Sequence, residues 1–277
     1  SLAVNIAHGH GFVFGMKEPF ESYQFELHGG NLREKFIAME PAPYFYRPPG
    51  YPWAVGMFYR YVADSPLAVK RLQLMAIVLS GLVYVVIGRK AWGRVGFWTA
   101  FVLWPAYLPW VTEHAHHVIP ESFQILLIPL VVLACLRAEK TRNLWVHGAL
   151  GIFIGLNILY RPTIIFFPAI YYGLRLWSGR AALKPVLAGA AACALVLAAW
   201  SAYASIQCGK PVLITTQTGT ALYTYNNPHT TETGTWWNRT DPADRRPRTE
   251  SQYLAESAAH YLNPGNLIRA FSQKSIR

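Results

Sequence analysis

The chain has 277 residues, of which 53% are hydrophobic and only 14% are charged, and its mean hydropathy is +0.19. This balance is unusual for a soluble domain and favours an all-α polytopic membrane protein, with a soluble protein of buried helices as the less favoured alternative. The net charge of +11 does not indicate nucleic-acid binding, because the basic residues are spread over helix ends rather than gathered into one patch.

The chain begins with SLAVNIAH, a pattern typical of the middle of an amphipathic helix, and stops at QKSIR without a terminating element. We therefore interpret the sequence as a fragment of a longer membrane protein. GHGFVFG predicts a glycine-punctuated turn, and RPPGYP breaks the chain again before WAVGMFYRYV. That last stretch is too short to span a bilayer, so we expect an interfacial helix with aromatic side chains at headgroup level, namely Trp53, Phe58, Tyr59 and Tyr61.

Six apolar runs predict a transmembrane helical bundle, at 72–87, 95–111, 122–136, 144–159, 163–177 and 186–206. Several are shorter than the roughly 18 to 20 residues needed to cross the hydrocarbon layer, so flanking residues must lengthen them. Prolines inside the runs also favour membrane helices, where neighbouring groups satisfy the freed carbonyls; they are Pro105, Pro109, Pro129 and Pro168. We expect a first exoplasmic loop with interfacial helices at 1–69, the bundle at 70–206 and an exoplasmic segment at 207–277.

Every second connection between the predicted spans is basic. The basic residues of these three connections are Arg89, Lys90 and Arg94, then Arg137, Lys140 and Arg142, and finally Arg175, Arg180 and Lys184. The positive-inside rule places these connections in the cytoplasm, so the intervening loops and both flanking regions face outward. The expected location is the bacterial inner (plasma) membrane.

EHAHHVIPES lies between the second and third predicted spans. Imidazole and carboxylate groups both bind divalent ions, so one hypothesis is a metal site formed by His114, His117 and Glu121. His114 and His117 share a helical face, whereas His116 points elsewhere, so a complete site needs ligands from another loop. Glu113 is close enough in the sequence to help hold the ion or to orient the base. The alternative is that the histidines form a polar cap on a short loop.

Several segments occur in a characteristic order between the spans: AVNIAHGHGFVFG, YRPPGYP with SPLAVKRLQ, the IPES entry to the third span, the YRP corner, and GKPVLITTQTGTALYTYNNP. Their order and spacing resemble the GT-C class of polytopic glycosyltransferases, in the branch of protein O-mannosyltransferase-like and aminoarabinose transferase-like enzymes. The resemblance implies transfer of a sugar from a polyprenyl-phosphate-linked donor to a lipid, glycan or protein acceptor at the outer face of the membrane.

The resemblance also implies site residues. The family's candidate general base follows the first membrane helix and would lie before Ser1, outside this chain. A second acidic position opens the third span, where this chain has Glu121, and Glu113 is the nearest other carboxylate. The YNNP region faces the active-site cavity in the family, which makes Asn226 and Asn227 candidates for recognition of sugar or acceptor hydroxyls.

Transfer from a lipid phosphate needs a base for the acceptor hydroxyl and cations for the leaving phosphate, all at the water–membrane boundary. Arg161 is the first candidate for the phosphate, because Pro162 fixes it at the outer end of a span and its planar fork suits phosphate oxygens. Lys70, Arg71 and Arg47 are second candidates. Each of these cations is equally explained as a snorkelling anchor to phospholipid headgroups.

A lipid flippase or transporter is the alternative from another functional class. It would use the same outer charges to bind a headgroup, and it predicts polar residues in the middle of the spans, where the sequence places few apart from Asn157. An intramembrane zinc hydrolase is disfavoured because the sequence has no HExxH motif. The sequence therefore favours the glycosyltransferase.

Overall fold

The computed structural model divides the chain into two compact units, one made of Ser1–Tyr44 and Pro48–Ile214, the other of Phe45–Arg47 and Thr215–Arg277. The structure describes residues 2–14, 42–43, 45–112, 118–179, 183–209 and 211–216. Within this part the first unit consists of helices and one pair of two-residue strands. The predicted all-α membrane fold is therefore confirmed.

The predicted helix and glycine turn at the start of the chain are both present. Helix α1 spans Leu2–Ala7, and the chain then turns through Gly9 and Gly11, whose φ angles are 82° and 75°. Residues with a Cβ rarely adopt these left-handed backbone conformations, which explains why glycines occupy these two positions. Beyond the turn, strand β1 (Val13–Phe14) pairs antiparallel with β2 (Ala42–Pro43), with Val13 opposite Pro43.

The short helix expected after RPPGYP is α3, which spans Gly50–Tyr61. Trp53 and Tyr61 are 52% and 72% exposed. The position of this helix at headgroup level stays a prediction, and Tyr59 differs from these two residues in facing the protein interior. Tyr59 is one helical turn from Val55, and both side chains are buried against α1 and the start of the next helix.

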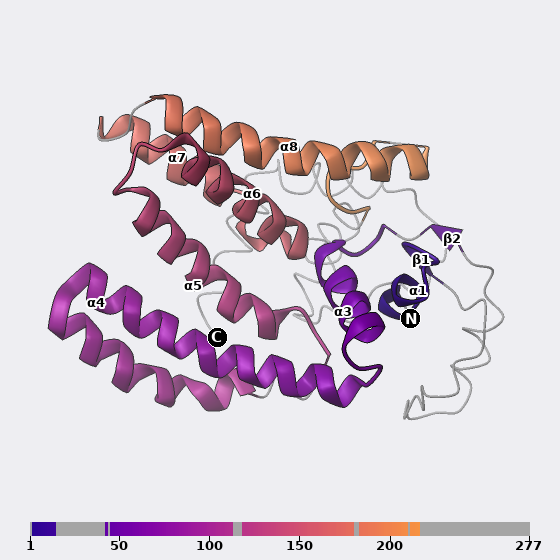
Figure 1. The fold of residues 1–277 in the computed structure, drawn as a ribbon, viewed down its shortest axis with the longest axis horizontal. Coiled ribbons are helices and arrows are strands. Elements are labelled where there is room, and N and C mark those ends of the chain that lie inside the picture. Colours follow the sequence, from indigo (N-terminus) through magenta and orange to yellow (C-terminus); the bar gives the residue numbers. More distant parts are fainter. Residues whose placement is uncertain are drawn as a thin grey trace, which may run out of the picture. The chain divides into compact units, whose positions relative to one another are not determined.

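The first two predicted spans form one helical hairpin, α4 (Pro66–Thr112), which Figure 1 shows as two adjacent arms. The arms meet at Trp92 and Gly93, where Gly93 has φ 63° and ψ −138°. Near this tip the arms touch through glycines, because a Cβ on Gly88 would collide with the carbonyl oxygen of Gly96. The basic connection predicted between these spans is thus a two-residue break rather than a loop.

The remaining helices are α5 (Glu121–Ala138), α6 (Leu144–Tyr160), the 3-10 turn η2 (Pro162–Ile164), α7 (Phe167–Trp177) and α8 (Leu183–Cys208). Within the described residues, α4, α5 and α8 are long and apolar enough to cross a membrane, and α6 is slightly shorter. Helix α7 has 11 residues and is about 17 Å long, so the fifth predicted span is not one continuous membrane helix. Pro168 accordingly lies in the first turn of α7, where proline is well tolerated, and not in a helix interior.

Two ion pairs nevertheless show that the η2–α7 segment runs along α5 from one end to the other. Arg161, just before η2, pairs with Glu121 in the first turn of α5. Arg175, in the last turn of α7, lies 3.9 Å from Glu139 just beyond the end of α5. The α5–α6 connection and the end of α7 therefore lie at one end of the unit, and Figure 1 shows the α4 break and the start of α8 at the same end, on the left. We call this the basic end.

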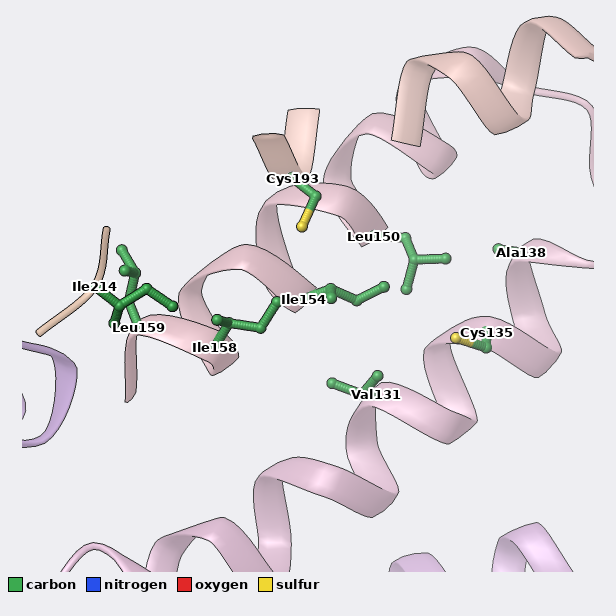
Figure 2. Close-up of a cluster of buried hydrophobic side chains, with 9 residues drawn as sticks. All are labelled: Val131, Cys135, Ala138, Leu150, Ile154, Ile158, Leu159, Cys193 and Ile214. Atoms are coloured by element: carbon green, nitrogen blue, oxygen red, sulfur yellow. The ribbon is translucent and has the colours of Figure 1, made fainter. Parts of the chain in front are cut away.

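Glycines bring α6 and α8 into close contact. A Cβ on Gly151 would collide with the carbonyl oxygen of Gly189, and one on Gly155 would lie 3.0 Å from Val196 Cβ. Small residues four positions apart let membrane helices approach closely, because association in lipid depends on van der Waals contact rather than on water exclusion. Figure 2 shows the resulting core, in which side chains of α5 and α6 meet Cys193 of α8 and Ile214.

Candidate functional site

The carboxyl end of α6 presents Arg161. Pro162 disfavours helical geometry in the residue before it, and Arg161 is extended, with φ −155° and ψ 121°. Its backbone N–H still donates to the Asn157 carbonyl at 3.0 Å, which closes the last turn of α6. The YRP corner thus ends the helix and leaves the Arg161 side chain at the helix terminus.

Arg161 forms an ion pair with Glu121, the first residue of α5. Arg161 Nη1 contacts Glu121 Oε1 without the alignment of a good hydrogen bond, and the two side chains are 31% and 35% exposed. Each charge also has favourable helix-dipole placement, because Glu121 is at an N-terminus and Arg161 at a C-terminus. The structure therefore brings the two leading sequence candidates together at the end of the bundle opposite the basic end.

Two tyrosines lie beside the ion pair because of a glycine. A Cβ on Gly50 would lie 2.6 Å from Tyr160 Cα, so only glycine allows the start of α3 to approach the end of α6 this closely. The next residue, Tyr51, then meets Tyr160 edge to face, with ring centroids 5.7 Å apart. Tyr51 and Tyr160 both lie within electrostatic range of Glu121. This contact explains why the RPPGYP and YRP segments belong to one site.

A second polar layer lies one turn deeper between α5 and α6. Gln124 Nε2 donates to Asn157 Oδ1 at 3.0 Å, and both side chains are buried. Gln124 is three residues after Glu121, and Asn157 is four residues before Arg161, so both pairs lie on the same facing helix surfaces. The polar groups therefore extend from the boundary into the helical bundle.

Unsatisfied hydrogen-bonding atoms are concentrated around these two layers. Proteins satisfy nearly all buried polar atoms, so such a concentration indicates a place for a polar ligand or for ordered water. In these two layers six buried side-chain atoms have no hydrogen-bond partner among the described residues. They are Tyr51 Oη, Glu121 Oε2, Gln124 Oε1, Asn157 Nδ2, Tyr160 Oη and Arg161 Nη1, the last of which contacts Glu121 only as an ion pair. Elsewhere in the described part such atoms occur only on Gln73, His147 and Tyr172.

The Tyr51 hydroxyl is a hydrogen-bond donor rather than a base. Burial raises the pKa of Tyr51 well above its ordinary value, and the nearby Tyr59 and Glu121 raise this pKa further. Since the neutral phenol is favoured, Tyr51 stays protonated at physiological pH. It can therefore donate to a ligand oxygen that arrives beside the Glu121 carboxylate.

The other predicted cations are distributed differently. Lys70 and Arg71 lie in the first turns of α4, which approaches the start of α5 through a hydrogen bond of 2.7 Å from Gln73 Nε2 to the Ile119 carbonyl. Neither forms an ion pair with a residue of the described part. Arg47 belongs to the second unit, where its guanidinium carbon lies 5.9 Å from the centre of the Tyr46 ring.

Several sequence candidates lie outside the described residues, namely Glu113, His114, His116, His117, Asn226 and Asn227. Among the residues that the structure does describe, no group of three or more His, Cys, Asp or Glu side chains could hold a metal ion. Of the predicted metal ligands only Glu121 is described, and its partner is Arg161.

Sequence reasoning missed Tyr51, Tyr160 and Gln124 as site residues. The structure also buries Gln73, Gln124 and His147 in addition to Asn157, all three near the starts of their helices rather than in the middle of the spans. The helical spacing of Gln124 from Glu121, and of Asn157 from Arg161, was a usable signal for the second polar layer. The tyrosine pair had no such signal, because Gly50 and Tyr160 are far apart along the chain.

Comparison with known proteins places this chain in a family. Neither the curated proteins nor the solved structures contain a match. The family model described as dolichyl-phosphate-mannose-protein mannosyltransferase matches residues 46–203, more than half of the chain. That span contains both partners of the ion pair and both tyrosines, and it agrees with the resemblance expected from the sequence. The chain therefore belongs to the dolichyl-phosphate-mannose-protein mannosyltransferase family and is a membrane glycosyltransferase of the GT-C type.

Proposed function

We propose that this protein transfers a sugar from a polyprenyl-phosphate-linked donor to an acceptor hydroxyl at the outer face of the membrane. The observation that carries the proposal is the Arg161–Glu121 ion pair at the end of the helical bundle, together with four neighbouring buried polar atoms that have no hydrogen-bond partner among the described residues, namely Tyr51 Oη, Gln124 Oε1, Asn157 Nδ2 and Tyr160 Oη. A phosphate headgroup on a lipid chain and a sugar with several hydroxyls together match a site that is cationic, rich in hydrogen-bonding atoms and bordered by membrane helices.

Arg161 is the proposed ligand of the donor phosphate. A guanidinium has five N–H donors, and the contact with Glu121 occupies one edge of the group. The remaining donors can bind phosphate oxygens in pairs, which both positions the donor and stabilises charge as the phosphate leaves. Lys70, Arg71 and Arg47 are proposed as secondary cations for the same headgroup.

In the proposed reaction the acceptor oxygen bonds to the sugar's anomeric carbon while the bond from that carbon to the phosphate oxygen breaks. The electron pair of the broken bond stays on the phosphate, and the acceptor proton passes to a carboxylate. Within the described part of the chain Glu121 Oε2 has no hydrogen-bond partner, so it can accept a hydrogen bond from the acceptor hydroxyl. Tyr51 and Tyr160 are proposed to donate to sugar oxygens.

Residues of the loop before α5 and of the last segment of the chain are also part of the proposal. Glu113 is proposed as a further carboxylate of the site, and Asn226 and Asn227 as ligands of the sugar or the acceptor. A divalent ion bound by His114, His117 and Glu121 is the accompanying metal hypothesis. Since Arg161 already balances the Glu121 charge, a bound cation would have to draw Glu121 away from Arg161.

The outward orientation is proposed from the charge distribution. The basic connections share one end of the bundle, which the positive-inside rule places in the cytoplasm, and the ion pair lies at the other end. With the native cysteines replaced, a single cysteine at Asn143 should resist an impermeant thiol reagent in intact cells, whereas one at His116 should react. Labelling at Asn143 with protection at His116 would invert the orientation.

The site itself is tested by removing single hydroxyl groups. Tyr51→Phe and Tyr160→Phe should leave thermal stability nearly unchanged, because neither hydroxyl has a hydrogen-bond partner among the residues that the structure describes. Each should weaken binding of a polyprenyl-phosphate sugar by about 0.5 to 1.5 kcal/mol, roughly 2- to 12-fold, if it donates to the ligand. The matched control is Tyr61→Phe, because Tyr61 lies on α3 like Tyr51 but its side chain is 72% exposed.

Binding can be measured by titration calorimetry on the full-length protein in detergent, with short-chain polyprenyl phosphate and its sugar-linked form as probes. The tyrosine variants should lose affinity mainly for the sugar-linked form, and Arg161→Ala should lose affinity for both. Equal affinities in Tyr51→Phe, Tyr160→Phe and Tyr61→Phe would argue against a sugar subsite at the tyrosine pair.

A further inference from the structure

The two arms of the α4 hairpin line an open cavity that the proposed sugar transfer does not use. Its volume is about 620 Å³, within the range of small-molecule sites, and both arms line it from Tyr84 to Leu103. The cavity lies at the tip of the hairpin, at the basic end, whereas the Arg161–Glu121 pair is at the opposite end. It is therefore separate from the candidate active site. We call it the hairpin groove.

Two kinds of residue form the groove. Glycines allow the two arms of α4 to contact each other, and larger side chains line the space beside this contact. Gly88 and Gly96 make backbone contact, since a Cβ on either would collide with the carbonyl oxygen of the other. Tyr84, Trp92 and Leu103 stand around this contact and contribute to the lining. Trp92 and Leu103 are 73% and 61% exposed, so the groove opens sideways toward the lipid rather than into the bundle.

Three cations lie at the tip of the hairpin, beside the groove. Arg89 directly follows the lining residue Gly88, Arg94 directly precedes the lining residue Val95, Lys90 is next to Arg89, and all three side chains are exposed. None of them forms an ion pair with a described residue. The segment 84–103 contains no Asp or Glu, whereas the neighbouring α5–α6 connection contains Glu139, which lies 3.9 Å from Arg175 of α7. The hairpin tip thus places positive charge without an ion-pair partner among the described residues next to an apolar groove.

We propose that the hairpin groove binds an anionic phospholipid of the leaflet at the basic end, with one acyl chain in the groove and the phosphate on Arg89, Lys90 and Arg94. The apolar lining matches a hydrocarbon chain, and the three cations match a negatively charged headgroup. Basic residues at the membrane surface attract anionic lipids in general. The groove adds a place for the chain, so binding here should be tighter than attraction to other basic connections.

The test compares lipid binding of the purified full-length protein in neutral detergent by native mass spectrometry. The probes are phosphatidylglycerol and phosphatidylcholine with identical acyl chains. The parent protein should retain phosphatidylglycerol at least tenfold more tightly than phosphatidylcholine. Equal retention of the two lipids would overturn the proposal.

Two pairs of variants separate the groove from general charge attraction. Arg89→Gln, Lys90→Gln and Arg94→Gln combined should lower phosphatidylglycerol affinity at least tenfold, whereas the matched triple of Arg137→Gln, Lys140→Gln and Arg142→Gln should change it less than threefold. Equal losses in the two triples would show surface attraction only and overturn the proposal.

The second pair tests occupancy of the groove by the acyl chain. Thr99 is exposed and lines the groove, so Thr99→Trp should fill it and lower phosphatidylglycerol affinity without disturbing the glycine contact. Val102 is 63% exposed on the same arm but does not line the groove, so Val102→Trp should have no effect. Unchanged affinity in Thr99→Trp, with a thermal unfolding temperature equal to that of Val102→Trp, would place the lipid outside the groove.

Discussion

The contact between Arg161 and Glu121 predicts that their effects on donor binding are coupled, with a definite sign. Arg161→Ala removes a charge-assisted hydrogen bond to phosphate, which is worth about 1.5 to 3 kcal/mol and corresponds to a roughly 10- to 150-fold loss of affinity. The same change also leaves the Glu121 carboxylate without its partner, close to the bound phosphate. Part of the loss should therefore come from repulsion between two negative charges.

The size of that repulsion follows from the geometry. A phosphate on the free edge of the guanidinium would lie roughly 6 Å from the carboxylate, and at a third exposed the pair has an effective dielectric constant of roughly 40 to 80. Coulomb's law then gives about 1 kcal/mol. Adding Glu121→Gln to Arg161→Ala should recover this amount, so the double variant should bind donor about fivefold more tightly than Arg161→Ala alone.

Glu121→Gln by itself should behave differently. Its amide oxygen can still accept a hydrogen bond from Arg161, so donor affinity should stay within about threefold of the parent while turnover falls. Binding of short-chain polyprenyl phosphate by calorimetry, together with initial transfer rates, separates the two effects. Matching thermal unfolding temperatures in detergent are the control. Donor binding in the double variant a further tenfold weaker than in Arg161→Ala would refute the reasoning, because Glu121 would then contact the donor independently, for example through a cation.

Two further predictions concern the fold that supports the site. Gly151→Ala should destabilise the protein by about 1 to 3 kcal/mol, because its Cβ would collide with the α8 backbone. The control is Gly148→Ala on the same helix, where a Cβ meets no atom within 4 Å, so this variant should be neutral or stabilising by up to about 1 kcal/mol. Similar unfolding temperatures for the two variants would argue against the glycine contact. Asn157→Leu should cost about 1 to 3 kcal/mol by leaving Gln124 unpaired, and adding Gln124→Leu should restore most of this stability; additive losses would show that the pair is not coupled.

The sequence by itself was sufficient for the features that depend on local pattern. Apolar runs located α4, α5, α6 and α8, because a chain in lipid must satisfy its backbone hydrogen bonds within each helix. The YRP corner located one helix end, since Pro162 stops α6, whereas the reversal of α4 at Gly93 became apparent only in the structure. The alternation of basic connections also fits the structure, where these connections share one end of the bundle. The length of α7 was misjudged because the apolar run continued through η2, which is not α-helical.

The tertiary structure alone decided which polar residues meet. Glu121 and Arg161 were separate candidates in the sequence, with roles as catalytic carboxylate and phosphate ligand, and only the adjacency of α5 and α6 makes them partners. Tyr51 joins them because Gly50 permits backbone contact with Tyr160, a condition that no local pattern reports. Helix formation depends on residues three or four positions apart, whereas the choice of facing helix surfaces depends on close contacts between residues distant along the chain. The sequence therefore determined the helices and the cations at their ends, and the contacts between helices determined the site.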